Sequence, residues 1–209
     1  MSQKIDDFLD ENAAALSYES EKYNVGLKYF WGVPTFWRGL ESKSGVKSIS
    51  ADAAIYDEFD EADPAQLQQA RQRLAFSEIK LSRELSVPTL PDFGINRRFQ
   101  LTDQCHFAFK CPHCSLWNIL EENWPHAFRQ RSTSSGGSEW YRACKKCHGE
   151  LDVSEGQWVP KNLGSKIRGY QISQLYSPFA SPTDIMNDFQ TTEFMGHFYN
   201  HVLGLPYLA

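Results

Sequence analysis

Two pairs of cysteines, each separated by two residues, constrain this chain more than any other feature. The first pair is Cys111 and Cys114, and the second is Cys144 and Cys147. Two intervening residues let the chain turn tightly enough for both sulfurs of a pair to reach one ion at about 2.3 Å, and two such pairs complete the tetrahedral ligand set of a zinc ribbon. The 29 residues between the pairs form a longer loop than such ribbons usually have. Four cysteine ligands favour a closed structural zinc site over a catalytic one, which keeps a position open for water.

Disulfide bonds are the alternative interpretation of these cysteines, and they need an oxidising compartment. The chain begins Met-Ser-Gln-Lys-Ile-Asp-Asp, without the basic region, apolar region or cleavage site of a secretory signal, so the sequence favours zinc. His113 and His148 lie inside or beside the pairs, and we expect them to face solvent or to support the ligands. The fifth cysteine, Cys105, is expected to be an inert, partly buried thiol.

The composition predicts one hydrophobic core with a small metal-bound module attached. The 209 residues are 41% hydrophobic. No apolar run approaches the roughly 20 residues that a membrane span requires, which predicts a soluble protein with no membrane partner. The net charge of −5 argues against a free-standing nucleic-acid binder, because phosphate affinity depends mainly on clustered lysine and arginine. Residues 103–149 differ, with six basic against four acidic residues and four histidines, so any nucleic-acid contact is expected there.

The patterns outside the cysteines predict an α/β fold. The apolar run Ala53–Tyr56 ends abruptly at Asp57, which predicts a buried strand of a mostly parallel sheet. A helix is predicted over residues 64–81, with Asp63 as its N-cap and Pro64 in its first position. The remaining predicted elements are a helix at 4–15, two strands around a turn at 32–34, a strand at 85–87, a strand at 167–175, and a helix from 181 to about 199.

Asp57 and Glu58 follow the predicted strand and are the candidate catalytic residues. In nucleotide-driven enzymes, an Asp at the end of a buried strand holds Mg²⁺, and a Glu beside it orients or deprotonates the attacking water. The alternative is that these two residues and the acids at positions 60, 61 and 63 form a solvated face before a helix. A phosphate-binding loop would support the first interpretation. Residues 39–48 do not match one, because they have one residue too many between the glycines and a valine before the lysine.

The whole succession of motifs resembles the large terminase subunit of tailed bacteriophages, in the lambda-like branch that carries a zinc-ribbon insert. That family is the ATP-driven motor that packages viral DNA into proheads. The segments that carry the likeness stand in the family's order: 38–44 (RGLESKS), 50–63 (SADAAIYDEFDEAD), 86–95 (SVPTLPDFGI), 111–114 (CPHC), 144–147 (CKKC) and 169–178 (GYQISQLYSP).

This resemblance implies a partial P-loop NTPase domain, built on a parallel sheet, with an inserted zinc ribbon of four cysteine ligands. Asp57 would be the Mg²⁺-binding residue of the Walker B motif, and Glu58 the catalytic carboxylate. Residues 86–89 would be the coupling motif that links hydrolysis to movement, so that Ser86 and Thr89 join Asp57 in the cofactor site. The implied domains are the C-terminal half of the ATPase-like domain at 1–104, the zinc ribbon at 105–160, and a strand and helix at 161–209 that pack on the ATPase-like domain.

The implied cofactors are structural Zn²⁺, from the cysteines, and Mg²⁺ and ATP, from the resemblance. The implied partners are double-stranded DNA, the small terminase subunit and the portal of the prohead, in the cytoplasm of a bacterial host. The family's Walker A segment and nuclease domain are not recognisable here, which predicts a terminase fragment with little ATP hydrolysis of its own. Such a fragment is a truncated or split gene product, a remnant, or a piece whose Walker A half another polypeptide supplies, and the sequence does not distinguish these. Asp184 and Asp188, one helical turn apart, are expected to be surface residues and not nuclease ligands.

A non-enzymatic zinc-ribbon adaptor that binds DNA or a partner protein is the alternative function from another class. Its basic surface would be made by Arg129, Arg131, Arg142, Lys145 and Lys146. The tryptophans of the same region could stack on bases, but in a small module they are expected to form its core; they stand at positions 117, 124, 140 and 158.

Overall fold

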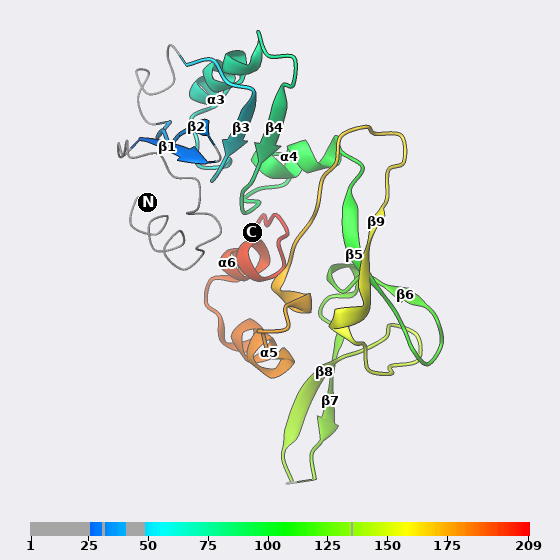
Figure 1. Ribbon diagram of the computed structural model, residues 1–209. Coiled ribbons are helices and arrows are strands. Elements are labelled where there is room, and N and C mark those ends of the chain that lie inside the picture. Colours follow the sequence, from blue (N-terminus) through cyan, green and yellow to red (C-terminus); the bar gives the residue numbers. More distant parts are fainter. Residues whose placement is uncertain (1–25, 31, 41–48, 135) are drawn as a thin grey trace. The chain divides into compact units, whose positions relative to one another are not determined.

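The computed structural model describes residues 26–30, 32–40, 49–134 and 136–209 (Figure 1). The helix predicted at 4–15 therefore lies outside the described residues. The chain divides into two compact units, Met1–Ala54 with Ala62–Arg83, and Ile55–Glu61 with Glu84–Ala209. Within the described ranges, no helix is long and apolar enough to cross a lipid bilayer.

The first unit contains an antiparallel strand pair and a capped helix. Strands β1 (Leu27–Phe30) and β2 (Val33–Phe36) confirm the expected pair of strands, but the turn predicted at 32–34 is shorter, because Val33 and Pro34 belong to β2. Gly32 has a left-handed φ of 78°. Helix α3 (Pro64–Arg71) begins as predicted, because the Asp63 side chain accepts a hydrogen bond from the backbone N–H of Ala65 at 2.7 Å.

The predicted extent of helix α3 is wrong at its C-terminal end. After Arg71 the chain makes one 3-10 turn, and residues from Leu81 onward form a strand. Further along, the Ser77 hydroxyl accepts the N–H groups of Ile79 at 3.0 Å and Lys80 at 3.3 Å. These bonds compete with helical ones and keep residues 77–80 out of the predicted helix.

Strands β3 (Ala53–Tyr56) and β4 (Leu81–Glu84) pair with each other. The N–H of Leu81 donates to the Asp52 carbonyl at 2.9 Å, and that of Leu85 to the Tyr56 carbonyl at 2.8 Å. Donor and acceptor both advance by four residues, so the pair is parallel, as predicted. The predicted burial of β3 is wrong for most of its length. Ile55 is 71% exposed, because the described residues give β3 a single neighbouring strand and only Tyr56 is buried.

The second unit contains the ribbon and a long hairpin. Strand β5 (Cys105–Lys110) lies between β6 (Trp117–Asn118) and β9 (Gly156–Pro160), antiparallel to both. Between β6 and β9 the chain forms the hairpin of β7 (Phe128–Ser132) and β8 (Ser138–Arg142). The strand predicted at 85–87 is displaced, since β4 ends at Glu84 and helix α4 (Gly94–Gln100) follows.

The C-terminal segment is mostly helical. The strand predicted at 167–175 is wrong. One parallel bridge joins Tyr170 to Cys105, and then the Ser173 hydroxyl accepts the N–H of Leu175 and starts a 3-10 turn. Helix α5 (Pro182–Thr191) begins where predicted, with Ser181 as its N-cap, and its Asp184 and Asp188 are exposed as expected. It ends sooner than predicted, and α6 (Met195–His197) with a π-helical turn (Phe198–Val202) follows after a break.

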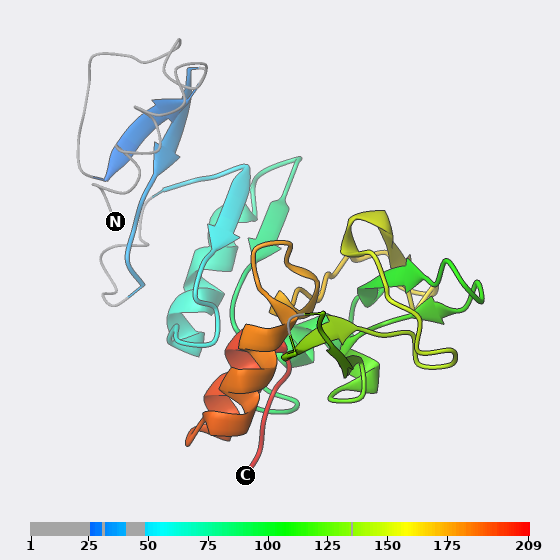
Figure 2. The ribbon, with the colours of Figure 1, turned by 90° about the horizontal axis from the view of Figure 1, so that it is seen from below.

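One core joins the ribbon, the hairpin and the C-terminal helices of this unit (Figure 2). Its large buried side chains include Phe109, Leu120, Phe128, Leu151, Leu175, Ile185, Met186, Phe198 and Leu203. Trp124 and Trp140 pack against this core as expected for the ribbon tryptophans, whereas Trp117 and Trp158 remain 41% and 38% exposed. The C-terminal segment therefore stabilises the ribbon through buried apolar area.

Arg142 fastens the hairpin to the C-terminal segment. Its guanidinium donates to the backbone carbonyls of Leu175, Ser177 and Ala180. Burial lowers the pKa of Arg142. Its expected place on a basic surface is therefore wrong, because its donors are used inside the fold.

Candidate functional site

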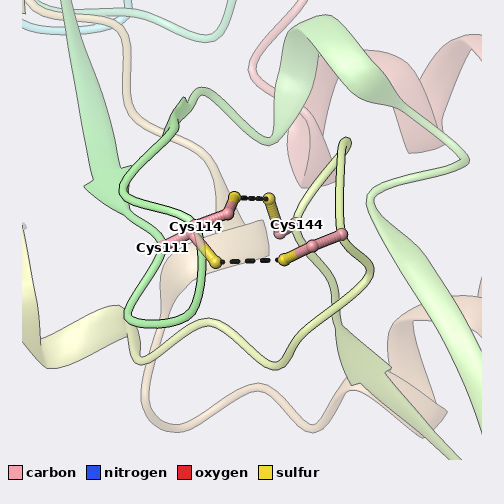
Figure 3. Close-up of side chains that lie close together, drawn as sticks. Cys111, Cys114 and Cys144 are labelled. Carbon is pink, nitrogen blue, oxygen red and sulfur yellow. Dashed lines mark hydrogen bonds between the residues drawn. The ribbon is translucent and has the colours of Figure 1, made fainter.

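The four paired cysteines come together in the second unit (Figure 3). All four sulfurs lie within 4.8 Å of one another. Cys111 Sγ is 3.5 Å from Cys147 Sγ, and Cys114 Sγ is 3.6 Å from Cys144 Sγ. Sulfurs bound at about 2.3 Å around a tetrahedral ion are about 3.8 Å apart. The cluster could therefore hold one metal ion, and its all-cysteine donor set fits Zn²⁺.

The two cysteine loops are built alike. The N–H groups of Cys111 and Cys144 each donate to the carbonyl of the fifth residue downstream, at 2.9 and 2.8 Å. The fourth residue downstream, Ser115 in one loop and His148 in the other, has a left-handed backbone with φ of 60° and 61°. This conformation folds each chain back, so both sulfurs of a pair point to the same side.

Backbone N–H groups prepare Cys144 to bind metal as a thiolate. Burial opposes its ionisation, but hydrogen bonds from the backbone N–H groups of Cys147 and Lys146, together with those from the Cys114 and Cys111 thiols, lower the pKa of Cys144 to about 6. The N–H of Lys146 lies 3.5 Å from Cys144 Sγ. The thiolate is the form of cysteine that binds metal.

The two histidines near the cluster face solvent, which is one of their two expected placements. His113 and His148 are both exposed, and among the described residues only the four cysteines form a group suited to a metal. The His148 ring nitrogen Nε2 lies 2.9 Å from the Arg129 guanidinium. Cys105 is fully buried, and burial raises the pKa of its thiol, which keeps it unreactive.

Asp57 and Glu58 begin an acidic loop, residues 57–61, directly after β3. Both side chains are exposed. Glu58 has a left-handed φ of 51°, and its N–H donates to the Asp57 carboxylate at 3.1 Å. The pair thus stands at the carboxyl end of a strand that runs parallel to β4, and this edge is where ligands bind in α/β sheets.

Ser86 and Thr89 contact Asp60 of that loop and not Asp57. The N–H of Asp60 donates to Ser86 Oγ at 3.0 Å. Thr89 donates to Asp60 Oδ2 twice, from its N–H at 3.0 Å and from its hydroxyl at 2.8 Å, and the N–H of Ile95 donates to Asp60 Oδ1 at 2.6 Å. Sequence reasoning missed Asp60. Its neighbour Phe59, an apolar residue inside an acidic run, is buried, but nothing in the sequence of the run singles out Asp60.

Gly94 leaves the space that the Asp60 carboxylate occupies. Its φ is 46°, and a Cβ at this position would lie 2.2 Å from Asp60 Oδ1. We expect Gly94→Ala to destabilise the protein by about 1–3 kcal/mol, because it adds both a clash and backbone strain. Thermal unfolding measures this loss. The matched change is Gly39→Ala, where an added Cβ would meet no atom of the described residues within 4 Å, its chain neighbours apart, and it should stay within about 0.5 kcal/mol of the wild type. Equal stability of the two variants would refute the clash.

A groove of about 610 Å³ lies beside the hairpin in the same unit. Phe128, Met186 and Phe189 contribute to its apolar lining, and His126, Arg129 and His148 are its basic side chains. Arg131 is not part of it, because it pairs with Glu139 at 2.7 Å and Glu150 at 2.5 Å. Arg131 is held in these ion pairs and Arg142 is held inside the fold. The basic surface expected for an adaptor therefore consists of Arg129, Lys145 and Lys146.

Comparison with known proteins identifies one related family. The sequence model described as phage terminase large subunit gpA, ATPase domain, matches residues 4–162. This range contains β3, the acidic loop, the segment after β4 and all four clustered cysteines. Searches of curated proteins and of solved structures gave no significant match.

Proposed function

This chain belongs to the phage terminase large subunit gpA ATPase-domain family, and we propose that it provides the Mg²⁺-binding and catalytic half of the motor that packages double-stranded DNA into proheads. The observation that carries the proposal is the position of Asp57 and Glu58. They are exposed carboxylates at the carboxyl end of β3, beside a parallel strand. Family membership adds the small terminase subunit and the portal as proposed partners.

Each acid has a separate role in this proposal. Asp57 holds Mg²⁺, and its carboxylate is oriented by the N–H of Glu58 at 3.1 Å. Glu58 positions the attacking water and accepts its proton. A bound Mg²⁺ neutralises charge on the β- and γ-phosphates. The phosphate-binding loop comes from a Walker A-containing segment, because residues 39–48 do not have its pattern.

The zinc ribbon has a structural role in this proposal. Four cysteine ligands fill all positions of a tetrahedral zinc ion and leave none for a reacting water. The ribbon shares its core with the C-terminal helices, so the metal stabilises the whole second unit.

Mg²⁺-dependent nucleotide binding tests this function. The zinc-loaded chain is mixed with a Walker A-containing segment from the same family, and the anisotropy of a fluorescent ATP analogue is followed with and without Mg²⁺. We expect Asp57→Asn to weaken binding at least tenfold in Mg²⁺ and to remove the Mg²⁺ dependence. The matched change Asp188→Asn, on the exposed side of α5, should bind as the wild type does. An Asp57→Asn variant with unchanged Mg²⁺ dependence would refute the assignment.

The groove beside the hairpin favours a second candidate function, an adaptor that contacts DNA through the ribbon region. Arg129 contributes its guanidinium to this groove, and apolar side chains lie next to it. We expect Arg129→Gln, in the full zinc-loaded chain, to weaken retention of duplex DNA at low salt by about 3- to 10-fold. The slope of the logarithm of the binding constant against the logarithm of salt concentration should become shallower by about one, the effect of losing one phosphate contact. Filter binding over a salt series measures both. The control is Arg97→Gln on α4. Equal losses in the two variants, or no retention at low salt, would remove this candidate.

A further inference from the structure

We propose that Asp60 is a positioning residue that fixes the catalytic loop to the segment after β4, so that the placement of Glu58 depends on residues 86–95. This inference rests on the ATPase function proposed above. It assigns a task to a residue that neither the acidic-pair motif nor the family description singles out.

The Asp60 carboxylate uses both oxygens on this segment. Oδ2 accepts two bonds from Thr89 and Oδ1 accepts one from Ile95, all between 2.6 and 3.0 Å. An ionised carboxylate only accepts, so it matches three donors at once. Bonds of this kind are stronger than those between neutral groups. Asparagine at position 60 would place an NH₂ group, which cannot accept a hydrogen bond, against the donors of either Thr89 or Ile95. The hydrogen bonds to that residue would be lost.

Short backbone bonds connect Asp60 rigidly to Glu58. The N–H of Glu61 donates to the Glu58 carbonyl at 3.0 Å and closes the turn that contains both acids. Phe59 lies buried between them, and its N–H donates to the Leu85 carbonyl at 3.0 Å. Phe59 therefore bonds to Leu85 and Asp60 to Ser86, so two consecutive residues of the acidic loop are attached to two consecutive residues after β4. A shift of Thr89 that is transmitted through Asp60 displaces Glu58, and displacement by about 1 Å can cost 10²-fold in rate.

Thr89 is also held from its other side. Its carbonyl accepts the N–H of Tyr207 at 3.1 Å, from the chain that follows the C-terminal helices. Those helices share their core with the ribbon. Thr89 thus lies between the catalytic loop and the part of the unit that includes the metal cluster, which suits a residue that links hydrolysis to movement.

A purely structural role is the alternative, because the bond to Ile95 also caps the first turn of α4. The two roles differ in kinetics. Loss of a structural cap lowers the amount of folded protein and leaves the turnover of the folded fraction unchanged. Loss of positioning lowers kcat per folded, zinc-loaded chain and leaves KM for ATP almost unchanged, since Asp60 does not touch nucleotide in this proposal.

The test measures ATP turnover by the full chain mixed with a Walker A-containing segment, for the wild type and for Asp60→Asn, Thr89→Val, Thr89→Ser, Glu58→Gln and Asp188→Asn. Rates are divided by the zinc-loaded, folded concentration. We expect Asp60→Asn and Thr89→Val to lower kcat at least tenfold with KM changed less than threefold. Thr89→Ser keeps the hydroxyl donor and should recover most of the loss, and Asp188→Asn should match the wild type.

The outcomes separate this inference from the function on which it rests. If the wild type shows no turnover, or Glu58→Gln turns over as fast as the wild type, the ATPase assignment fails and this inference fails with it. If Glu58→Gln is inactive while Asp60→Asn and Thr89→Val keep the wild-type kcat per folded chain, the ATPase assignment stands and the positioning role is refuted. A kcat that falls equally in Thr89→Ser and Thr89→Val also refutes it, because the hydroxyl bond would then be irrelevant.

Discussion

Replacing Glu58 with glutamine should lower ATP turnover in the presence of a Walker A-containing segment by about 10²–10⁴-fold, the usual contribution of a positioned general base. Glutamine has nearly the same shape, but it cannot accept the proton of the attacking water. Glu58 is exposed and its left-handed backbone is compatible with either side chain, so we expect no loss of folded protein. A coupled-enzyme assay of phosphate release measures the effect.

Glu61 provides the matched control for this prediction. It is an exposed glutamate in the same loop, and Glu61→Gln removes the same charge three residues away. Its turnover should stay within about threefold of the wild type, because charge removal alone has a weak effect at an exposed position. Similar losses in Glu58→Gln and Glu61→Gln would mean that the loop acts through its total charge, and the specific role of Glu58 would be disproved.

Replacing Cys144 with alanine should release the metal and unfold the ribbon. Zinc sites of this kind contribute an apparent binding free energy of about 10–16 kcal/mol, which a small module cannot replace by apolar burial. Cys144 is fully buried within the core that joins the ribbon to the C-terminal helices, so the loss should spread through the second unit. Metal analysis should find one zinc per wild-type chain and little in the variant, and circular dichroism should show lost strand structure.

Cys105 is the matched control for the metal prediction. It is also fully buried, but it lies outside the cluster of four sulfurs. Cys105→Ala should keep one zinc per chain at a cost of about 1–2 kcal/mol, the order expected for a small buried side chain. Zinc retained by Cys144→Ala, or lost by Cys105→Ala, would contradict the ligand assignment.

Features set by short-range chemistry were predictable from the sequence. The two cysteine pairs fix their own loop geometry through the spacing of two residues, and the predicted cluster forms. The starts of α3 and α5 were predictable because Asp63 and Ser181 accept the first backbone N–H groups of those helices. The ends of both helices were not, since they depend on side chains that capture backbone groups, as Ser77 does after α3.

Contacts between residues that lie far apart in the sequence could not be predicted from local sequence patterns. Asp60 meets Thr89 and Ile95 only because β3 and β4 lie side by side, which brings together residues 29 and 35 positions apart. Within the acidic run, the sequence does not distinguish Asp60 from its neighbours. Arg142 shows the same limit, because the carbonyls that bury its guanidinium come from residues more than 30 positions later.

If the acidic loop is one half of a nucleotide-hydrolysing site, turnover should require the other half. The zinc-loaded chain is assayed for ATP turnover alone, and then mixed with a Walker A-containing segment that is itself assayed alone. We expect Mg²⁺-dependent turnover in the mixture well above the sum of the two separate rates. If the mixture is no faster than that sum, the acidic loop is not half of such a site.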